Sequence, residues 1–327
     1  MSLRIATFNV ENLMNRFDFS GYRNELRQDR ALKLYDIKTE AQYRQLELAR
    51  AISQTDDSRQ MTALAIVQAD ADILCMQEVD NLDALHAFEY GYLFKMIGRG
   101  YMRKYMIEAN DSRGIDVAIM MREFLRMESH AYLTYADLEL YDEDIARTNQ
   151  PGDKIFRRDC LEIDVKVGGR PLTIYITHFK SMGSARDGVE GRIVTMPVRA
   201  AEAKAVRHII EKRFGKDRAA SKRWVICGDM NDGFSENVVR RRAELDRWTL
   251  YHTRGPQERH LCQLDYLLLS PSLASHNAKK VPDIVRAGQP YRTIFPPGLE
   301  VDRYPRTGWD RPKASDHCPV AISLDLL

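Results

Sequence analysis

The chain has 327 residues, of which 44% are hydrophobic and 29% charged, so it can bury a sizeable core and is not expected to be disordered. Its 49 basic and 47 acidic side chains nearly cancel, which excludes a globally basic protein and restricts any nucleic-acid site to a local patch. No run approaches the roughly 20 apolar residues that a membrane span requires, so we expect no membrane partner.

The chain begins with a strand pattern instead of a targeting segment. Residues 3–8 predict a strand, and no basic region with a long apolar stretch and a cleavage site accompanies them. The five cysteines are scattered, mostly in apolar runs, and lack the spacing of a metal site, as expected for buried thiols in a reducing compartment. We therefore expect a cytoplasmic location.

Helical patterns are few. Thr39 and Gln42 have the spacing of a capping box, and apolar residues then recur at near-helical spacing. The pattern resumes after residue 58, and residues 197–214 predict an amphipathic helix with proline near its first turn. Residues 16–38 are polar and charged and predict an irregular excursion or a short surface helix. Residues 290–313 are rich in Pro, Arg, Tyr and Gly and predict a loop.

Short apolar or alternating runs predict strands along the whole chain, at residues 3–8, 72–77, 115–121, 161–167, 172–177, 224–227, 264–269 and 319–324. Gly168-Gly169 between two of these runs predicts a hairpin. Many strands with few helices favour an α/β (α+β) fold in which two β-sheets pack face to face with helices outside. Polar residues stand at the strand ends, namely Asn9, Glu78, His178, Asp229, Asn231, Asp316 and His317.

The run from Trp224 to Cys227 predicts a buried strand, and Gly228 predicts a sharp turn after it. Asp229 and Asn231 would then aim a carboxylate and an amide oxygen at one point, which suits a hard cation, a water or a phosphate. A solvated turn is the plainer alternative for this pattern.

Asp265 lies inside an apolar strand, where an unpaired carboxylate would cost several kcal/mol. It therefore needs a partner, and His317 at the start of the last strand is the best candidate.

Glu78 fits either a metal ligand or an ordinary charge at the end of a strand. His178 fits either a phosphate contact or a histidine satisfied within the core.

Six short motifs occur in the order seen in the endonuclease/exonuclease/phosphatase superfamily: Phe8-Asn9-Val10-Glu11, Gln77-Glu78, Thr177-His178, Gly228-Asp229-Met230-Asn231, Leu264-Asp265-Tyr266 and Ser315-Asp316-His317. The chain resembles this family over nearly its whole length, and is most similar to its deoxyribonuclease I-like members and to bacterial predicted nucleases. The resemblance implies a four-layer sandwich formed by one catalytic domain over residues 1–327.

The resemblance also implies a role for each matching residue. Glu78, Asn9 and Asp316 would hold Mg²⁺ or Mn²⁺ through oxygen atoms, which these ions prefer. Asp229 would polarise the attacking water, with Asn231 beside it. His317, oriented by Asp265, and His178 would contact the phosphate. Arg113 and Lys180 are candidates for binding the substrate.

These residues predict a metal-dependent phosphodiester hydrolase, most simply a nuclease acting on DNA or RNA. Basic side chains in two loops agree with a nucleic-acid partner, namely Lys180, Arg186, Arg192, Arg292, Arg303, Arg306, Arg311 and Lys313, with Tyr304 and Trp309 among them. A phosphatase or phosphodiesterase for a small phosphorylated metabolite or lipid headgroup is the alternative, and a catalytically dead binding scaffold is a third. No obligate protein partner is expected.

Overall fold

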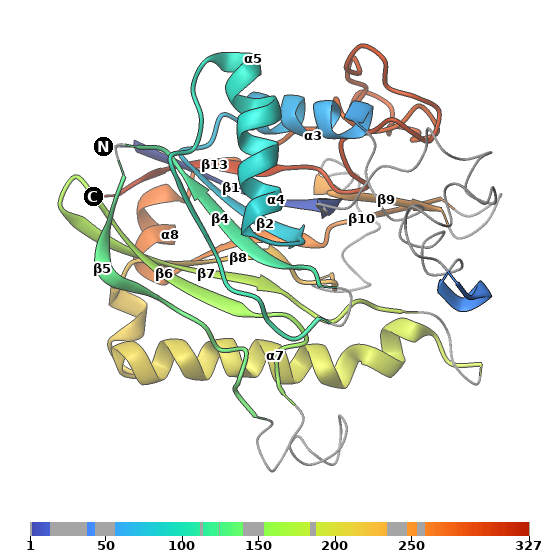
Figure 1. Ribbon diagram of the computed structural model, residues 1–327. Coiled ribbons are helices and arrows are strands. Elements are labelled where there is room, and N and C mark those ends of the chain that lie inside the picture. The colour runs from blue at the N-terminus through green and yellow to red at the C-terminus, as the bar shows by residue number, and fades with distance from the viewer. Residues whose placement is uncertain are drawn as a thin grey trace.

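The structure is a computed structural model that describes residues 2–13, 38–42, 56–111, 114–123, 125–139, 154–183, 188–233, 247–253 and 259–326. Two mixed β-sheets pack against each other and carry helices on their outer faces (Figure 1). No helix in these ranges is long and apolar enough to cross a membrane.

The first sheet has six strands in the order β12-β13-β1-β2-β4-β3. Its strands are β1 (Ser2–Leu13), β2 (Ile73–Val79), β3 (Arg103–Met106), β4 (Asp116–Met121), β12 (Asp283–Ile284) and β13 (Val320–Asp325). Its two central strands, β1 and β2, are parallel, and Asn9 is in register with Gln77. Their carboxyl ends therefore lie side by side.

The second sheet has five strands in the order β11-β8-β7-β6-β5. Its strands are β5 (Arg126–Leu133), β6 (Cys160–Val167), β7 (Arg170–His178), β8 (Trp224–Asp229) and β11 (Asp265–Leu269). Here β7 and β8 are the parallel pair, with His178 in register with Asp229. A small separate sheet pairs β9 (Leu250–Thr253) with β10 (Arg259–Cys262).

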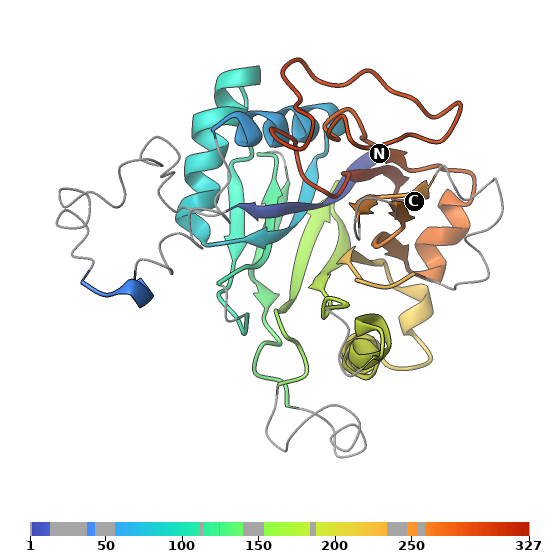
Figure 2. The same cartoon turned by 90° about the vertical axis from the view of Figure 1, so that its right-hand side faces the viewer.

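Helices cover both outer faces. Helix α3 (Asp56–Ala69) and the run of α4 (Leu82–Phe88), the π-helix Glu89–Phe94 and α5 (Lys95–Ile97) lie over the first sheet, and α7 (Gly191–Phe214) lies over the second (Figures 1 and 2). The 3₁₀ turn Ala219–Ser221 follows α7, and α8 (Pro271–Asn277) follows β11.

Strand β1 shows how the core forms. Leu3 and Ile5 point into the core between the two sheets, whereas Ala6 and Phe8 point into the core under the helices. Alternate side chains of a strand face opposite ways, so a strand buried on both faces needs an almost continuous apolar run. That requirement explains why the sequence predicted the central strands well.

Most of the predicted elements are present. The hairpin of β6 and β7 forms, and residues 290–313 contain no helix or strand. Thr39 and Gln42 form the capping box, in which the Gln42 amide donates to Thr39 Oγ1 at 3.2 Å and the Thr39 amide donates to Gln42 Oε1 at 3.0 Å. Most of the predicted excursion at residues 16–38, and the helical pattern after residue 42 as far as 55, lie outside the described residues.

Several predicted boundaries were wrong, among them the end of β1, which runs to Leu13 instead of residue 8. Helix α7 begins at Gly191 instead of residue 197, because Thr195 Oγ1 and Arg199 Nη2 donate to the carbonyls of Gly191 and Arg192 and so hold the first turns together. Strand β8 continues through Gly228 to Asp229. At Gly228 a Cβ atom would lie 1.8 Å from the Thr177 carbonyl oxygen, so glycine is required by the close approach of β7.

We expect Gly228→Ala to lower the free energy of unfolding by about 1–3 kcal/mol or more, because the new methyl group displaces the backbone of β7. The backbone φ of 147° adds strain for any side chain. Urea unfolding would measure the change. Gly91→Ala is the control, because nothing lies within 4 Å of its added Cβ. Equal stability of Gly228→Ala and wild type would contradict this account of the contact between β7 and β8.

Candidate active site

Polar residues from both sheets meet where the parallel strands end. Asn9 comes from β1, Glu78 from β2, His178 from β7 and Asp229 from β8. The Asn9 amide Nδ2 lies 3.1 Å from Asp229 Oδ2 and 3.4 Å from Glu78 Oε1, so one amide joins carboxylates of the two sheets. His178 Nε2 faces the same oxygens, at 3.6 Å from Asp229 Oδ2 and 4.0 Å from Glu78 Oε1.

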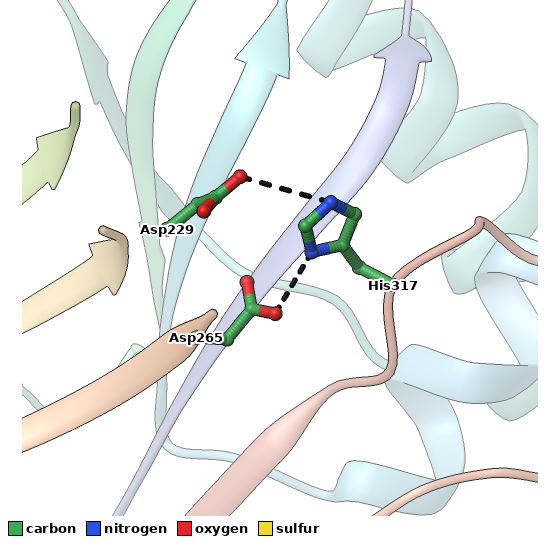
Figure 3. Close-up of side chains that lie close together, drawn as sticks. All are labelled: Asp229, Asp265 and His317. Atoms are coloured by element: carbon green, nitrogen blue, oxygen red, sulfur yellow. Dashed lines mark hydrogen bonds and ion pairs between the residues drawn. The ribbon is translucent and has the colours of Figure 1, made fainter. Parts of the chain in front are cut away.

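Asp265 and His317 complete this group (Figure 3). His317 Nδ1 is hydrogen-bonded to Asp265 Oδ2 at 2.8 Å, as expected from the sequence, and His317 Nε2 points at Asp229 Oδ2 from 3.7 Å. Asp265 is in register with Asp229 on neighbouring strands. Thr249 Oγ1 accepts hydrogen bonds from the amides of Leu264 and Asp265 and thereby fixes the start of β11.

The pKa values of Asp229 and His317 are both shifted from their ordinary values. Burial raises the pKa of Asp229, and although His317 opposes this, the pKa reaches about 7, with Asp265 also raising it. Burial alone would lower the pKa of His317, but Asp265 and then Asp229 outweigh burial and hold it well above 6.5. His317 is therefore a charged donor at neutral pH, and Asp229 is poised near neutrality.

Two hydrogen bonds, each involving a backbone group, hold Asn231 in place. Its amide N–H donates to Asp229 Oδ1 at 2.8 Å, and its side-chain Nδ2 donates to the Phe179 carbonyl at 3.0 Å. Arg158 Nη1 donates to the same carbonyl at 2.9 Å and is ion-paired with Asp111. Sequence analysis missed Arg158, because the pair Arg157-Arg158 before a strand carries no pattern that indicates a site.

A second acidic group adjoins the first. Glu11 accepts the Asp316 amide N–H at 3.0 Å and forms ion pairs with Lys313 Nζ at 2.7 Å and Arg311 Nη2 at 2.9 Å. Ser315 Oγ donates to the Asn9 carbonyl at 2.8 Å and ties this group to the first. The sequence placed Glu11 in the motif Phe8-Asn9-Val10-Glu11 but showed no sign of its pairing with Lys313.

Backbone strain is concentrated here. Glu11, Asn12, Glu78 and Asn231 have left-handed φ values of 51°, 61°, 66° and 49°. Such values cost a non-glycine residue on the order of 1 kcal/mol or more. They turn amide groups toward site side chains, since the Glu11, Asn12 and Asn231 amides donate to Asn9 Oδ1, Glu78 Oε2 and Asp229 Oδ1.

The site fits a hard divalent cation. The ligand atoms of Asp229, Asp265 and His317 all lie within 4.8 Å of one another and could hold an ion. Among the residues that the structure describes, Asp265 Oδ1 is buried without a hydrogen-bond donor. His317 is charged and hydrogen-bonded to Asp265, so its imidazole has no free nitrogen lone pair for a metal ion. We therefore favour oxygen ligands around Glu78 over the imidazole of His317.

The expected substrate-binding residues are less clearly placed. Arg113 and Arg186 lie outside the described ranges. Lys180 is half-buried, and its amide donates to Glu202 Oε2 at 2.7 Å. Most of the basic side chains named from the sequence contact groups within the protein. Arg192 pairs with Asp232, Arg292 with Asp310, Arg303 stacks on Tyr291 and Phe295, and Arg311 and Lys313 pair with Glu11.

Comparisons with known proteins agree with this architecture. The model of the Endonuclease/Exonuclease/phosphatase family matches residues 6–317. TDP2 from Caenorhabditis elegans is 15% identical, with 99% of this chain and 75% of that chain covered and a TM-score of 0.51. D. rerio TDP2, solved with a single strand DNA product, is 13% identical, with 99% of each chain covered and a TM-score of 0.50. No curated protein matches. At these identities the structural likeness shows the fold alone.

The raised pKa of Asp229 predicts a pH dependence of stability in protein kept metal-free with EDTA. Between pH 3.8 and about 7 the folded chain holds a proton on Asp229 that the unfolded chain has lost, so the contribution of Asp229 to stability falls as pH rises. Asp229→Asn cannot titrate. Its unfolding free energy should therefore increase relative to wild type by up to about 1.4 kcal/mol per pH unit, beyond a constant offset for lost contacts.

Urea unfolding of both proteins at several pH values across this window would measure the difference. A difference that does not change with pH would show that Asp229 titrates normally in the folded protein.

Proposed function

The chain belongs to the endonuclease/exonuclease/phosphatase family of divalent-metal-dependent enzymes that hydrolyse phosphodiesters, and from that premise we propose that it is a nuclease acting on DNA or RNA. One observation carries the proposal. Asn9, Glu78, His178, Asp229 and His317, drawn from both sheets and from both ends of the chain, face one point. We further propose that residues 1–327 form a single catalytic domain.

A bound Mg²⁺ or Mn²⁺ would neutralise the charge of the phosphodiester and stabilise the charge that develops during hydrolysis. Glu78 would hold it, and Asn9, whose Nδ2 faces Glu78 and Asp229 in this structure, would contribute its amide oxygen after rotation of the amide group. Asp316, also expected from the sequence as a ligand, lies beyond Ser315 next to Glu11.

Asp229 is proposed as the general base. Its Oδ1 is fixed by the Asn231 amide, and its Oδ2 lies among Asn9, His178 and His317, so the carboxylate has one orientation. A base works best when its pKa is near the working pH, and the pKa of Asp229 is about 7. Asn231 holds this carboxylate and the end of β7 together through the Phe179 carbonyl.

His317 and His178 are proposed to donate hydrogen bonds to the phosphate. Asp265 fixes the ring of His317 through Nδ1 and leaves Nε2 directed at the reacting centre. A fixed, charged donor in a buried site stabilises developing negative charge without reorganising. His178 is buried opposite it and presents Nε2 to the same point.

The nucleic-acid partner rests on two observations. Trp309 lies in the loop of residues 290–313 and is 70% exposed, as suits a side chain that stacks on a base. A protein of the same fold, D. rerio TDP2, was solved with a single strand DNA product.

The competing candidate is a phosphatase or phosphodiesterase for a small ester. It is favoured by the ion pairs of Arg292, Arg311 and Lys313 within the protein, which leave fewer cations for a polyanion.

Incubation of the purified protein with Mg²⁺ or Mn²⁺ would separate these functions. We expect cleavage of plasmid, single-stranded DNA or RNA, and loss of that cleavage in excess EDTA. Without the metal ion, the carboxylates of the site would repel the negatively charged phosphodiester instead of neutralising it. Release of orthophosphate from small phosphomonoesters, without any cleavage of nucleic acid, would support the small-ester enzyme. Activity that survives EDTA would contradict the metal role.

We expect Asp229→Asn and His317→Ala each to reduce turnover by at least about 10²-fold, a typical contribution of a general base or a phosphate donor. Circular dichroism and thermal unfolding would show whether each variant remains folded. His276→Ala is the matched control, because His276 is exposed on α8 and its ring is hydrogen-bonded to Ser272 and Ser275 of the same helix. Near wild-type rates in either site variant would remove that residue from the mechanism.

A further inference from the structure

Helix α7 carries buried charges as well as apolar side chains. It covers the outer face of the second sheet, where Ala205, Val206 and Ile209 pack (Figure 1). Arg199 and Glu202 of the same helix are 4% and 0% exposed, although both are charged. A buried charge is costly unless it is paired or hydrogen-bonded. The partners of these two charges lie next to the ends of the active-site strands.

The carboxylate of Glu202 binds two backbone amides. Its Oε2 accepts the Lys180 amide at 2.7 Å, and its Oε1 accepts the Arg157 amide at 3.1 Å. Burial raises the pKa of Glu202 to about 7, and the two amides, which oppose this rise, stabilise the ionised form. Lys180 lies two residues beyond His178 and outside β7, so Glu202 takes the place of a neighbouring strand there.

Arg199 holds the other side of the same segment. Its Nη1 donates to the Lys180 carbonyl at 3.3 Å, and its Nε donates to Asp232 Oδ2 at 3.0 Å. Asp232 directly follows Asn231. Arg199 and Glu202 therefore tie α7 to the segments that follow β7 and β8.

The backbone between Lys180 and His178 is part of the site. The Phe179 amide donates to the Asp229 carbonyl at 2.9 Å, and the Phe179 carbonyl accepts Asn231 Nδ2 at 3.0 Å. His178 Nε2 lies 3.6 Å from Asp229 Oδ2, which is longer than a hydrogen bond, so this contact does not fix the ring. A displacement of Lys180 would move Phe179 and, with it, His178.

We propose that Glu202 is a positioning residue for His178: it holds the Lys180 amide and thereby fixes the end of β7, without touching substrate. This inference rests on the proposed function, in which His178 donates a hydrogen bond to the phosphate. It gives α7 a role beyond covering the sheet. Because Glu202 acts through one backbone segment, its loss should affect the reaction through His178.

A double-mutant cycle tests the proposal. Glu202→Gln keeps the size of the side chain but replaces one acceptor oxygen by a donor, which cannot bind an amide N–H. We expect kcat for nucleic-acid cleavage to fall about 10-fold with KM near the wild-type value, because a misplaced donor weakens binding of the transition state. In a His178→Ala background the same substitution should lower kcat by less than about 2-fold, because the residue on which Glu202 acts is already absent.

Glu162→Gln is the matched control for a buried carboxylate. Glu162 is 1% exposed on β6, where it accepts the Tyr135 hydroxyl at 2.9 Å and pairs with Arg213. We expect Glu162→Gln to lower stability in urea unfolding and to leave kcat at the wild-type value. A loss of kcat equal to that in Glu202→Gln would show a general effect of destabilisation and would overturn the inference.

Nuclear magnetic resonance of the metal-free protein gives a readout that needs no activity. The ring nitrogen signals of His178, identified by their loss in His178→Ala, should shift in Glu202→Gln and stay in place in Glu162→Gln. In wild type the Lys180 amide should be protected from hydrogen exchange, because it donates to the buried carboxylate of Glu202.

Rapid exchange of the Lys180 amide in wild type would overturn the inference, even if Glu202→Gln failed to fold. Equal losses of kcat in the wild-type and His178→Ala backgrounds would also overturn it. A wild type that cleaves no nucleic acid would refute the proposed function alone. Unchanged His178 ring signals in a folded Glu202→Gln would refute this inference alone.

Discussion

The hydrogen bonds across the seam between the two sheets are the constraint on which the rest of the structure depends. Asn9 of the first sheet reaches Asp229 of the second, and His317, just before β13, reaches Asp265 on β11. These contacts join segments of different sheets. The site residues therefore meet only when the two sheets are correctly aligned. A shift of one sheet against the other would separate donor from acceptor and leave charges buried without partners, at a cost of several kcal/mol.

The same seam explains why the site is costly to maintain. It collects buried carboxylates, a charged imidazole and four residues with left-handed backbone, none of which favours folding by itself. The apolar core between the sheets and the cores under α3 and α7 must offset these costs. Residues that serve chemistry are thus supported by packing elsewhere, as expected for a site arranged for reaction and not for stability.

Charge balance in the site is divided between the chain and its expected cofactor. Lys313 and Arg311 neutralise Glu11, whereas Asp229 and Asp265 rely on histidines whose charge depends on their surroundings. The carboxylate of Glu11 is therefore paired with permanent cations of the chain, whereas the carboxylate proposed as the general base is paired with histidines.

The sequence predicted β1, β2, β4, β6, β7, β8, β11 and β13, the hairpin of β6 and β7 and the capping box of Thr39 and Gln42, because alternation and capping depend on near neighbours. It did not predict β3, β5, β9, β10 and β12. The need for glycine at Gly228 and the pairing of Lys313 with Glu11 were set by the tertiary structure, because both depend on contacts between distant segments. Asn9 and Asp229 are separated by 220 positions, and only the order of strands within the packed sheets brings them together. Periodicity within a strand carries no information about which strand lies beside it.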